Sequence, residues 1–102
     1  MACSKLVRDK IPAIIESKGQ VPSIRILSGD EYTDALEQKL DEEVGEYHKD
    51  KNLEELADIL EVIYALIENL GHSKEELLTA YEQKHLQRGG FQKRIFLISN
   101  EG

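Results

Sequence analysis

Hydrophobic residues recur every three or four positions through residues 36–47 and 53–67, which is the spacing of one face of an α-helix. The first stripe consists of Leu36, Leu40, Val44 and Tyr47. The second stripe consists of Leu53, Leu56, Leu60, Ile63 and Ile67, and Ile59, Val62 and Leu66 widen it around the helix. We therefore expect two amphipathic helices, the second of them covered from two sides.

Helix starts are marked by a Ser or Asn followed three positions later by Glu, a pattern that satisfies free N–H groups of the first turn. The pairs are Ser28–Glu31, Asn52–Glu55 and Ser73–Glu76, and the predicted helix ends are near Lys49, Gly71 and Gly89. A shorter helix is predicted from Asp9, with Pro12 in its first turn, to Gly19. The short connections predict an antiparallel bundle of about four helices, an all-α fold, in a single domain of residues 1–102.

Two short segments outside the predicted helices have the composition of strands. "SIRIL" (residues 23–27) alternates polar and apolar side chains. After the glycines near residue 90, "FQKRIFLIS" (residues 91–99) resembles a second strand, which is expected at about residues 93–98. We expect these segments to pair in a short β ribbon beside the helices.

Some carboxylates lie among the apolar positions of the two central helices. At about 100° per residue, Glu43 falls near the middle of the first stripe and Glu46 lies one turn later at its flank. Glu55 and Asp58 flank Val62 on the second helix. The remaining acids of that helix, Glu54, Glu61 and Glu68, gather on its polar side. We therefore expect the first four to be partly buried and the last three to be solvated.

Four partly buried carboxylates need a compensating charge, because an unpaired buried charge costs several kcal/mol. Residues three apart on a helix have Cβ atoms roughly 5 to 6 Å apart, so two facing pairs can direct four oxygens at one cation. An all-carboxylate set favours Mg²⁺, with Mn²⁺ as an alternative, over Zn²⁺. Charged residues make up 32% of the chain, so a single Glu-x-x-Glu is commonly a solvated face. Two such pairs on consecutive apolar faces favour a metal site.

The length and net charge of the chain limit the kinds of partner that it is expected to bind. A chain of 102 residues buries only a modest core, so we expect a homodimer or homotetramer. The net charge of −7 argues against nucleic acid as a partner, because the phosphate backbone is also negatively charged. No run approaches the roughly 18 apolar residues of a membrane span. The charged opening "MACSKLVRDKIP" predicts a cytoplasmic protein, and the single cysteine, Cys3, excludes an intrachain disulfide.

Three blocks of the sequence together resemble a known superfamily. "EEVGE" (residues 42–46) followed by "EELAD" (residues 54–58) is similar to the EExxE…ExxD signature of the all-α nucleoside triphosphate pyrophosphatases, which include MazG, dimeric dUTPases and phosphoribosyl-ATP pyrophosphohydrolase. "KLVRDKIP" (residues 5–12) and "KHLQRGGF" (residues 84–91) resemble its compact, phosphoribosyl-ATP pyrophosphohydrolase-like or MazG-like branch. The resemblance implies a MazG-like helical bundle completed by oligomerisation.

The resemblance also implies an activity: Mg²⁺-dependent hydrolysis of a nucleoside triphosphate between the α and β phosphates, giving a nucleoside monophosphate and pyrophosphate. By position, the implied metal ligands are Glu43, Glu46, Glu55 and Asp58. Glu42 and Glu43 are the implied catalytic residues, with Glu42 orienting the water or supporting the ligands. Only eight residues separate Glu46 from Glu55. This short loop leaves the nucleotide open, and removal of nonstandard nucleotides is as compatible as a biosynthetic step.

A phosphate-bearing substrate also requires cations from the protein. Lys84 and Arg88 lie one turn apart before Gly89 and Gly90, whose backbone N–H groups can approach a phosphate closely. Further candidates are Lys5, Arg8, Lys93 and Arg94. The alternative for all of them is a solubilising surface or charges that complement a helix dipole.

Two other classes of protein are alternatives to a pyrophosphatase. A carboxylate-bridged dimetal oxidase needs Glu-x-x-His on two helices, and the chain offers only the pair Glu82 and His85, outside the paired acids. The stronger alternative is a non-catalytic helical interaction module, in which the acids form ion pairs. Such a module is indifferent to Mg²⁺.

Overall fold

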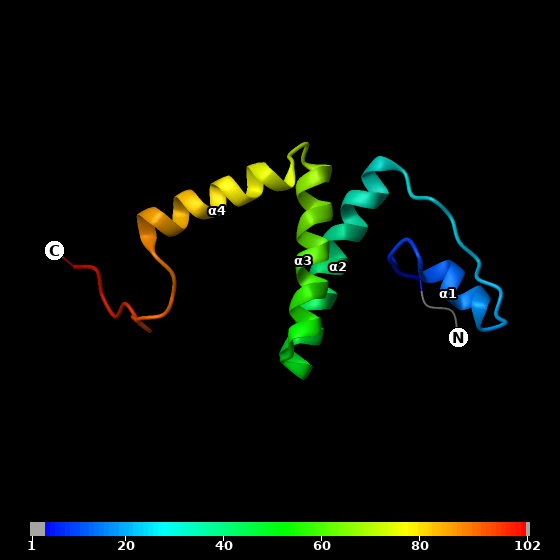
Figure 1. Cartoon of the computed structure of the whole chain (residues 1–102), viewed down its shortest axis with the longest axis horizontal. Helices are drawn as coiled ribbons and strands as arrows, with labels where there is room; N and C mark the ends of the chain where they lie inside the picture. Colours follow the sequence, from blue (N-terminus) through cyan, green and yellow to red (C-terminus); the bar gives the residue numbers. More distant parts are fainter. Residues whose placement is uncertain (1–3, 102) are drawn as a thin grey trace.

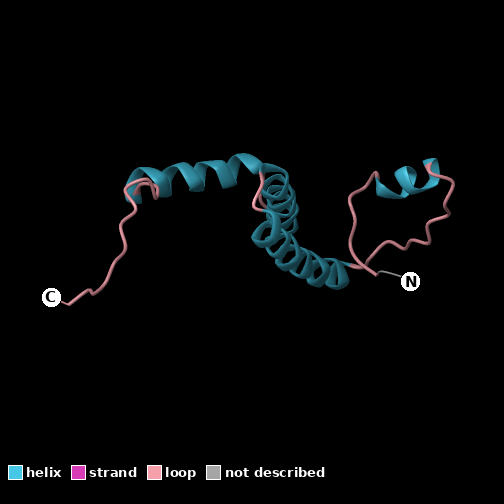
Figure 2. Cartoon of the chain, turned by 90° about the horizontal axis from the view of Figure 1, so that it is seen from below, coloured by secondary structure: helices cyan, strands magenta, loops and turns pink. Residues whose placement is uncertain are grey.

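The computed structural model describes residues 4–101, a range that excludes Cys3, and this part of the chain contains four helices and no strand. The helices are α1 (Ile11–Ser17), α2 (Gly29–Asp50), α3 (Leu53–Asn69) and α4 (Lys74–Arg88). Figure 2 shows them joined by loops only. The all-α class predicted from the sequence is confirmed.

The helix starts follow the local capping signals. Ser28 and Glu31 form a reciprocal capping box at α2, and Ser73 and Glu76 form another at α4. At α3, the Asn52 side chain accepts a hydrogen bond from the backbone N–H of Glu55, with a length of 3.0 Å. The predicted helix ends are right to within about two residues. Only α1 differs at its start, because Lys10 rather than Asp9 is its N-cap.

Helices α2 and α3 form an antiparallel hairpin, the centre of the structure (Figure 1). The turn between them is tight, and Lys51 adopts a left-handed conformation with φ of 48°. At the open end of the hairpin, the Asn69 amide Nδ2 donates a hydrogen bond of 2.9 Å to Oγ1 of Thr33. Among residues 4–101, the buried apolar side chains all belong to these two helices: Leu36, Val62 and Ile67. The hairpin therefore contains the core.

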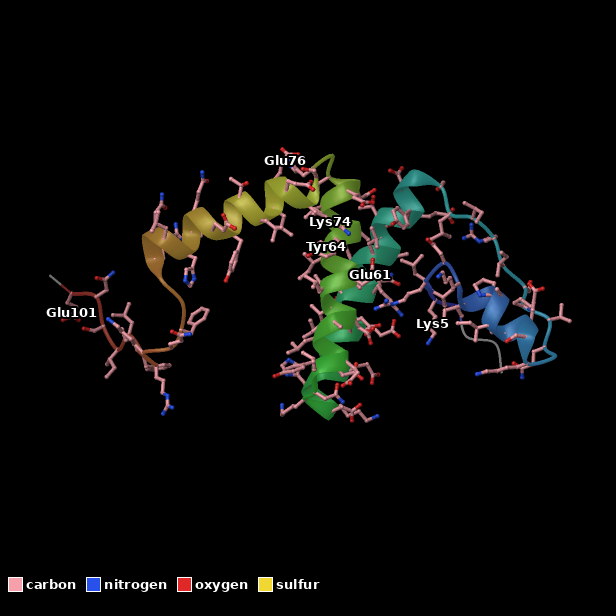
Figure 3. The ribbon with its side chains drawn as sticks, viewed as in Figure 1. Lys5, Glu61, Tyr64, Lys74, Glu76 and Glu101 are labelled. Atoms are coloured by element: carbon pink, nitrogen blue, oxygen red, sulfur yellow. The ribbon has the colours of Figure 1, made fainter. Side chains whose placement is uncertain are left out.

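Helices α1 and α4 lie outside the hairpin. Helix α1 lies on one side of it, and α4 leaves the end of α3 on the other side (Figures 1 and 2). Lys74 anchors the start of α4, with Nζ 4.5 Å from the centre of the Tyr64 ring on α3 (Figure 3). One chain thus supplies a two-helix hairpin with two projecting helices, and the predicted four-helix bundle is not closed within it.

The dimensions show how open this arrangement is. The chain measures 62 × 31 × 23 Å and has a radius of gyration of 18.1 Å, whereas a compact domain of this length has about 13 Å. Its accessible surface is 9383 Å², compared with about 5,800 Å² for a folded monomer of this mass. Many large apolar side chains therefore remain exposed, including Leu53 on α3, Leu86 on α4 and Phe96 in the C-terminal segment.

The predicted β ribbon is wrong. Residues 23–27 and 93–98 are loops, and they lie at opposite ends of the molecule (Figure 1). The alternating pattern was compatible with a strand, but a two-stranded ribbon is marginally stable without a further apolar surface to cover it. Here neither segment has a strand partner within the described range.

None of the helices in residues 4–101 combines the length and the apolar character that crossing a membrane requires.

Candidate metal centre

Three carboxylates from the two central helices converge. Glu43 lies on α2, and Glu55 and Asp58 lie one turn apart on α3. One oxygen of each lies within 4.8 Å of the others, and all three residues are partly buried. The packing of α2 against α3 sets the position of Glu43, while the Asn52 cap holds the first turn of α3, where Glu55 lies.

The separation of these oxygens fits a single hard cation. Oxygen ligands lie about 2.0 to 2.6 Å from Mg²⁺ or Ca²⁺, so ligands on opposite sides of the ion are about 4 to 5 Å apart. The three oxygens lie within 4.8 Å of one another, so they are already close enough to share one such ion. The donors are carboxylates alone, which suits Mg²⁺ or Mn²⁺ better than Zn²⁺.

Glu55 is the carboxylate with the least compensation. Partial burial raises its pKa above the usual value, and repulsion from the negative charges of Asp58, Asp50, Glu46 and Glu43 raises it further. No Lys, Arg or His within residues 4–101 forms an ion pair with Glu55. A cation at this position would therefore relieve an unfavourable interaction.

The other two carboxylates have cationic neighbours. Nη2 of Arg8 donates a hydrogen bond of 2.6 Å to Oδ1 of Asp58. Nζ of Lys39 lies 3.3 Å from Oε1 of Glu43. These cations come from different places, since Arg8 precedes α1 whereas Lys39 lies on α2 itself.

A surface hollow of about 240 Å³ connects these groups. It is lined by Lys5, Val7, Arg8, Ile11, Lys39, Glu43 and Asp58. Figure 3 shows Lys5 on the N-terminal segment, on the side of the hairpin that carries Glu61. Cations and carboxylates thus share one hollow between the N-terminal segment and the two central helices.

Two predicted site residues lie at the edge of this cluster. Glu46 is exposed and is not among the three converging carboxylates, contrary to the expected partial burial. Its negative charge still contributes to the raised pKa of Glu55. Glu42 is 38% exposed and lies 3.3 Å from Nζ of Lys39 and 3.9 Å from Nζ of Lys5. Glu54, Glu61 and Glu68 are exposed, as expected.

The predicted phosphate-binding cations divide into two groups. Lys5 and Arg8 lie beside the carboxylates. The others, Lys84, Arg88, Lys93 and Arg94, lie at the far end of α4 and in the segment after it. Because α4 points away from the hairpin, this second group lies apart from the carboxylates of the same chain (Figure 1).

Lys39 contacts Glu42 and Glu43 but is not among the site residues predicted from the sequence. It lies three residues before Glu42 and four before Glu43, and these spacings place side chains on the same face of a helix. That spacing was visible in the sequence. The contact between Arg8 and Asp58 had no comparable signal, because it joins residues 50 positions apart.

Comparison with known proteins gives one partial similarity. A protein of Mycolicibacterium smegmatis, described as an uncharacterized protein, is 58% identical over 43 residues. The match covers 42% of this chain and 44% of that protein, so the chain spans less than half of its relative. No family model matches the chain. No solved structure matches it either.

Proposed function

We propose that the chain is a Mg²⁺-dependent nucleoside triphosphate pyrophosphohydrolase that cleaves between the α and β phosphates and gives a nucleoside monophosphate and pyrophosphate. The observation that carries the proposal is the convergence of Glu43, Glu55 and Asp58 within 4.8 Å, together with the raised pKa of Glu55. The resemblance of residues 42–46 and 54–58 to the pyrophosphatase signature supports the reaction class. Nonstandard nucleotides are a candidate substrate class.

In this proposal Glu43, Glu55 and Asp58 hold the cation, and Glu46 joins from the exposed flank. Mn²⁺ is the alternative ion. When bound, the cation supplies positive charge to phosphate oxygens and assists ionisation of the attacking water. Glu42 then orients the water and accepts its proton. As the water oxygen bonds to the α phosphorus, the bond from that phosphorus to the bridging oxygen breaks and pyrophosphate leaves.

The positions of Lys5 and Arg8 support a role for the N-terminal segment in binding phosphate. Both side chains line the same hollow as Glu43 and Asp58, and Arg presents paired donors that match phosphate oxygens. Lys84, Arg88, Lys93 and Arg94 belong to a different part of the molecule (Figure 1). In this proposal they act on the site of a second copy of the chain.

We also propose that the chain forms a homodimer or homotetramer, and the extent of its exposed surface supports this. The accessible area of 9383 Å² exceeds the value for a compact monomer by roughly 3,500 Å². A stable interface buries about 800 Å² on each partner, so the excess is large enough for one or more interfaces. Leu53, Leu56 and Leu60 supply exposed apolar surface on α3. We expect Leu60→Asp to shift the assembly towards monomer in sedimentation velocity.

The proposed activity is tested by measuring pyrophosphate and monophosphate release from a panel of standard nucleotides, nonstandard nucleotides and phosphoribosyl-ATP. We expect release with Mg²⁺ and none with EDTA. The activity of Glu43→Gln should fall by at least about 100-fold, since the variant removes the carboxylate charge and so weakens metal binding. Glu68→Gln is the matched control, because Glu68 is an exposed acid of α3. Equal activity in Glu43→Gln and the wild type would refute the assignment.

A non-catalytic helical interaction module is the second candidate. The observation that favours it is that Asp58 and Glu43 already have cationic partners, Arg8 and Lys39. The two candidates differ in their response to metal. Mg²⁺ should raise the midpoint of thermal unfolding of a pyrophosphatase by mass action, and it should leave a module of ion-paired helices unchanged.

A further inference from the structure

We propose that Arg8 is an internal counter-ion of the metal centre: it pairs with Asp58 in the metal-free chain, and a divalent cation displaces it towards the phosphates of the substrate. This inference rests on the proposed function, because it requires a cation at Glu43, Glu55 and Asp58. It adds a conformational role for the N-terminal segment, residues 4–10.

The contact itself indicates competition. Nη2 of Arg8 lies 2.6 Å from Oδ1 of Asp58, and Nη1 lies 3.9 Å from Oε1 of Glu61. The guanidinium therefore holds its positive charge against a carboxylate that also belongs to the converging cluster. A divalent cation coordinated by Asp58 would lie within a few ångströms of Arg8, and like charges at that separation repel. Metal binding and the Arg8 contact are thus in opposition.

Arg8 is also less enclosed by its surroundings than Lys39, the second cation of the hollow. It lies in a segment without regular structure before α1, and its side chain is 53% exposed. Lys39 belongs to α2 and its side chain is only 17% exposed. An exposed ion pair contributes little stability. A bound cation would therefore displace Arg8 more readily than Lys39.

The displaced guanidinium has a place to go. Arg8, Glu43 and Asp58 line the same hollow of about 240 Å³. Phosphates bound to a cation in this hollow would be within reach of Arg8 without a rearrangement of the hairpin. The planar guanidinium presents several N–H donors, which suit phosphate oxygens as well as they suit the carboxylate of Asp58.

The first test is the binding of Mn²⁺ alone, followed by the electron paramagnetic resonance signal of the free ion. We expect Arg8→Gln to bind Mn²⁺ about threefold more tightly than the wild type or better, since the variant removes the competing charge. Arg25→Gln is the matched control. It makes the same change in net charge, and Arg25 pairs with Glu31, at 2.6 Å, rather than with the carboxylate cluster.

The second test uses inorganic tripolyphosphate as the probe, titrated calorimetrically as its Mg²⁺ complex into protein saturated with Mg²⁺. In this test we expect Arg8→Gln to lose affinity where it gained affinity for Mn²⁺. The variant should bind tripolyphosphate about tenfold more weakly than the wild type and Arg25→Gln do. Unchanged or weaker Mn²⁺ binding by Arg8→Gln, or unchanged tripolyphosphate binding, would overturn the role of Arg8 alone. Absence of Mn²⁺ binding by all three proteins would overturn the metal centre, and the inference with it.

Discussion

Nζ of Lys39 lies 3.3 Å from Oε1 of Glu43, and the two side chains are only 17% and 12% exposed. No other ion pair among residues 4–101 is as well shielded from water. Their i and i+4 positions on α2 bring the charges together. Lys39 therefore compensates the acid that lies on the apolar face of α2.

Replacing Lys39 with Met should lower the free energy of unfolding by about 1 to 3 kcal/mol, between the values for exposed and fully buried pairs. The loss arises because Glu43 keeps its charge without a partner. Saturating Mg²⁺ should recover part of it, since a cation at the carboxylate cluster takes over the compensation. Urea unfolding with EDTA and with Mg²⁺ measures both effects. Lys18→Met, at an exposed site after α1, should change neither, and an equal loss there would contradict the prediction.

Glu55 should make the stability of the metal-free protein fall as the pH rises. Its pKa is raised in the folded chain by partial burial and by neighbouring carboxylates, so the folded state binds the proton more tightly than the unfolded state. This contribution is complete below the ordinary pKa of 4.5 and is lost as the pH rises through the raised pKa. Glu55→Gln removes the dependence, because Gln does not ionise.

The test for Glu55 is urea unfolding in EDTA between about pH 4 and pH 7. At pH 7 we expect Glu55→Gln to be more stable than the wild type in EDTA but to gain less from Mg²⁺. The matched control is Glu54→Gln, because Glu54 is an exposed neighbour on the same turn of α3. Lower stability of Glu55→Gln in EDTA at pH 7 would show that the carboxylate is not repelled by its neighbours.

Glu31 should have the opposite effect. Hydrogen bonds from Arg25 and then from Ser28 lower the pKa of Glu31 from 4.5 to about 2. Its contribution to stability is therefore present above pH 4.5 and is lost as the pH falls towards about 2. Glu31→Gln should be less stable than the wild type at neutral pH, and the two proteins should converge in acid. Unfolding midpoints across this range measure the effect, with Glu37→Gln, an exposed acid of the same helix, as control. A constant difference at every pH would rule out the ionised cap.

Substitutions at Leu36 and Leu86 test two different properties: the stability of the hairpin and the self-association of the chain. Leu36 is 2% exposed, and Leu36→Ala should lower the free energy of unfolding by about 2 to 5 kcal/mol through the cavity that it leaves. Leu86 is 87% exposed in the single chain. Leu86→Ala should leave the unfolding of isolated chains unchanged and weaken self-association if α4 packs on a second copy. Urea unfolding and sedimentation velocity distinguish the two effects. Equal destabilisation of dilute monomer by both variants would contradict the division.

The helices and the candidate acids were largely predictable, because the signals involved are local. The three pairs of cap and Glu lie within one helical turn, so they act before any tertiary contact forms. The apolar stripes likewise identified Glu43, Glu55 and Asp58 as partly buried acids. Glu46 was misplaced, because its burial depends on which part of the α2 flank α3 covers, and helix periodicity alone does not determine that.

The sequence by itself determined where the helices begin and which acids share their apolar faces, since both depend on residues only a few positions apart. Only the tertiary structure decided that α4 projects from the hairpin and that residues 23–27 and 93–98 lie too far apart to pair (Figure 1). It also brought Arg8 to Asp58 across 50 positions. Such contacts depend on how the loops place whole segments in space, and no local periodicity encodes that placement.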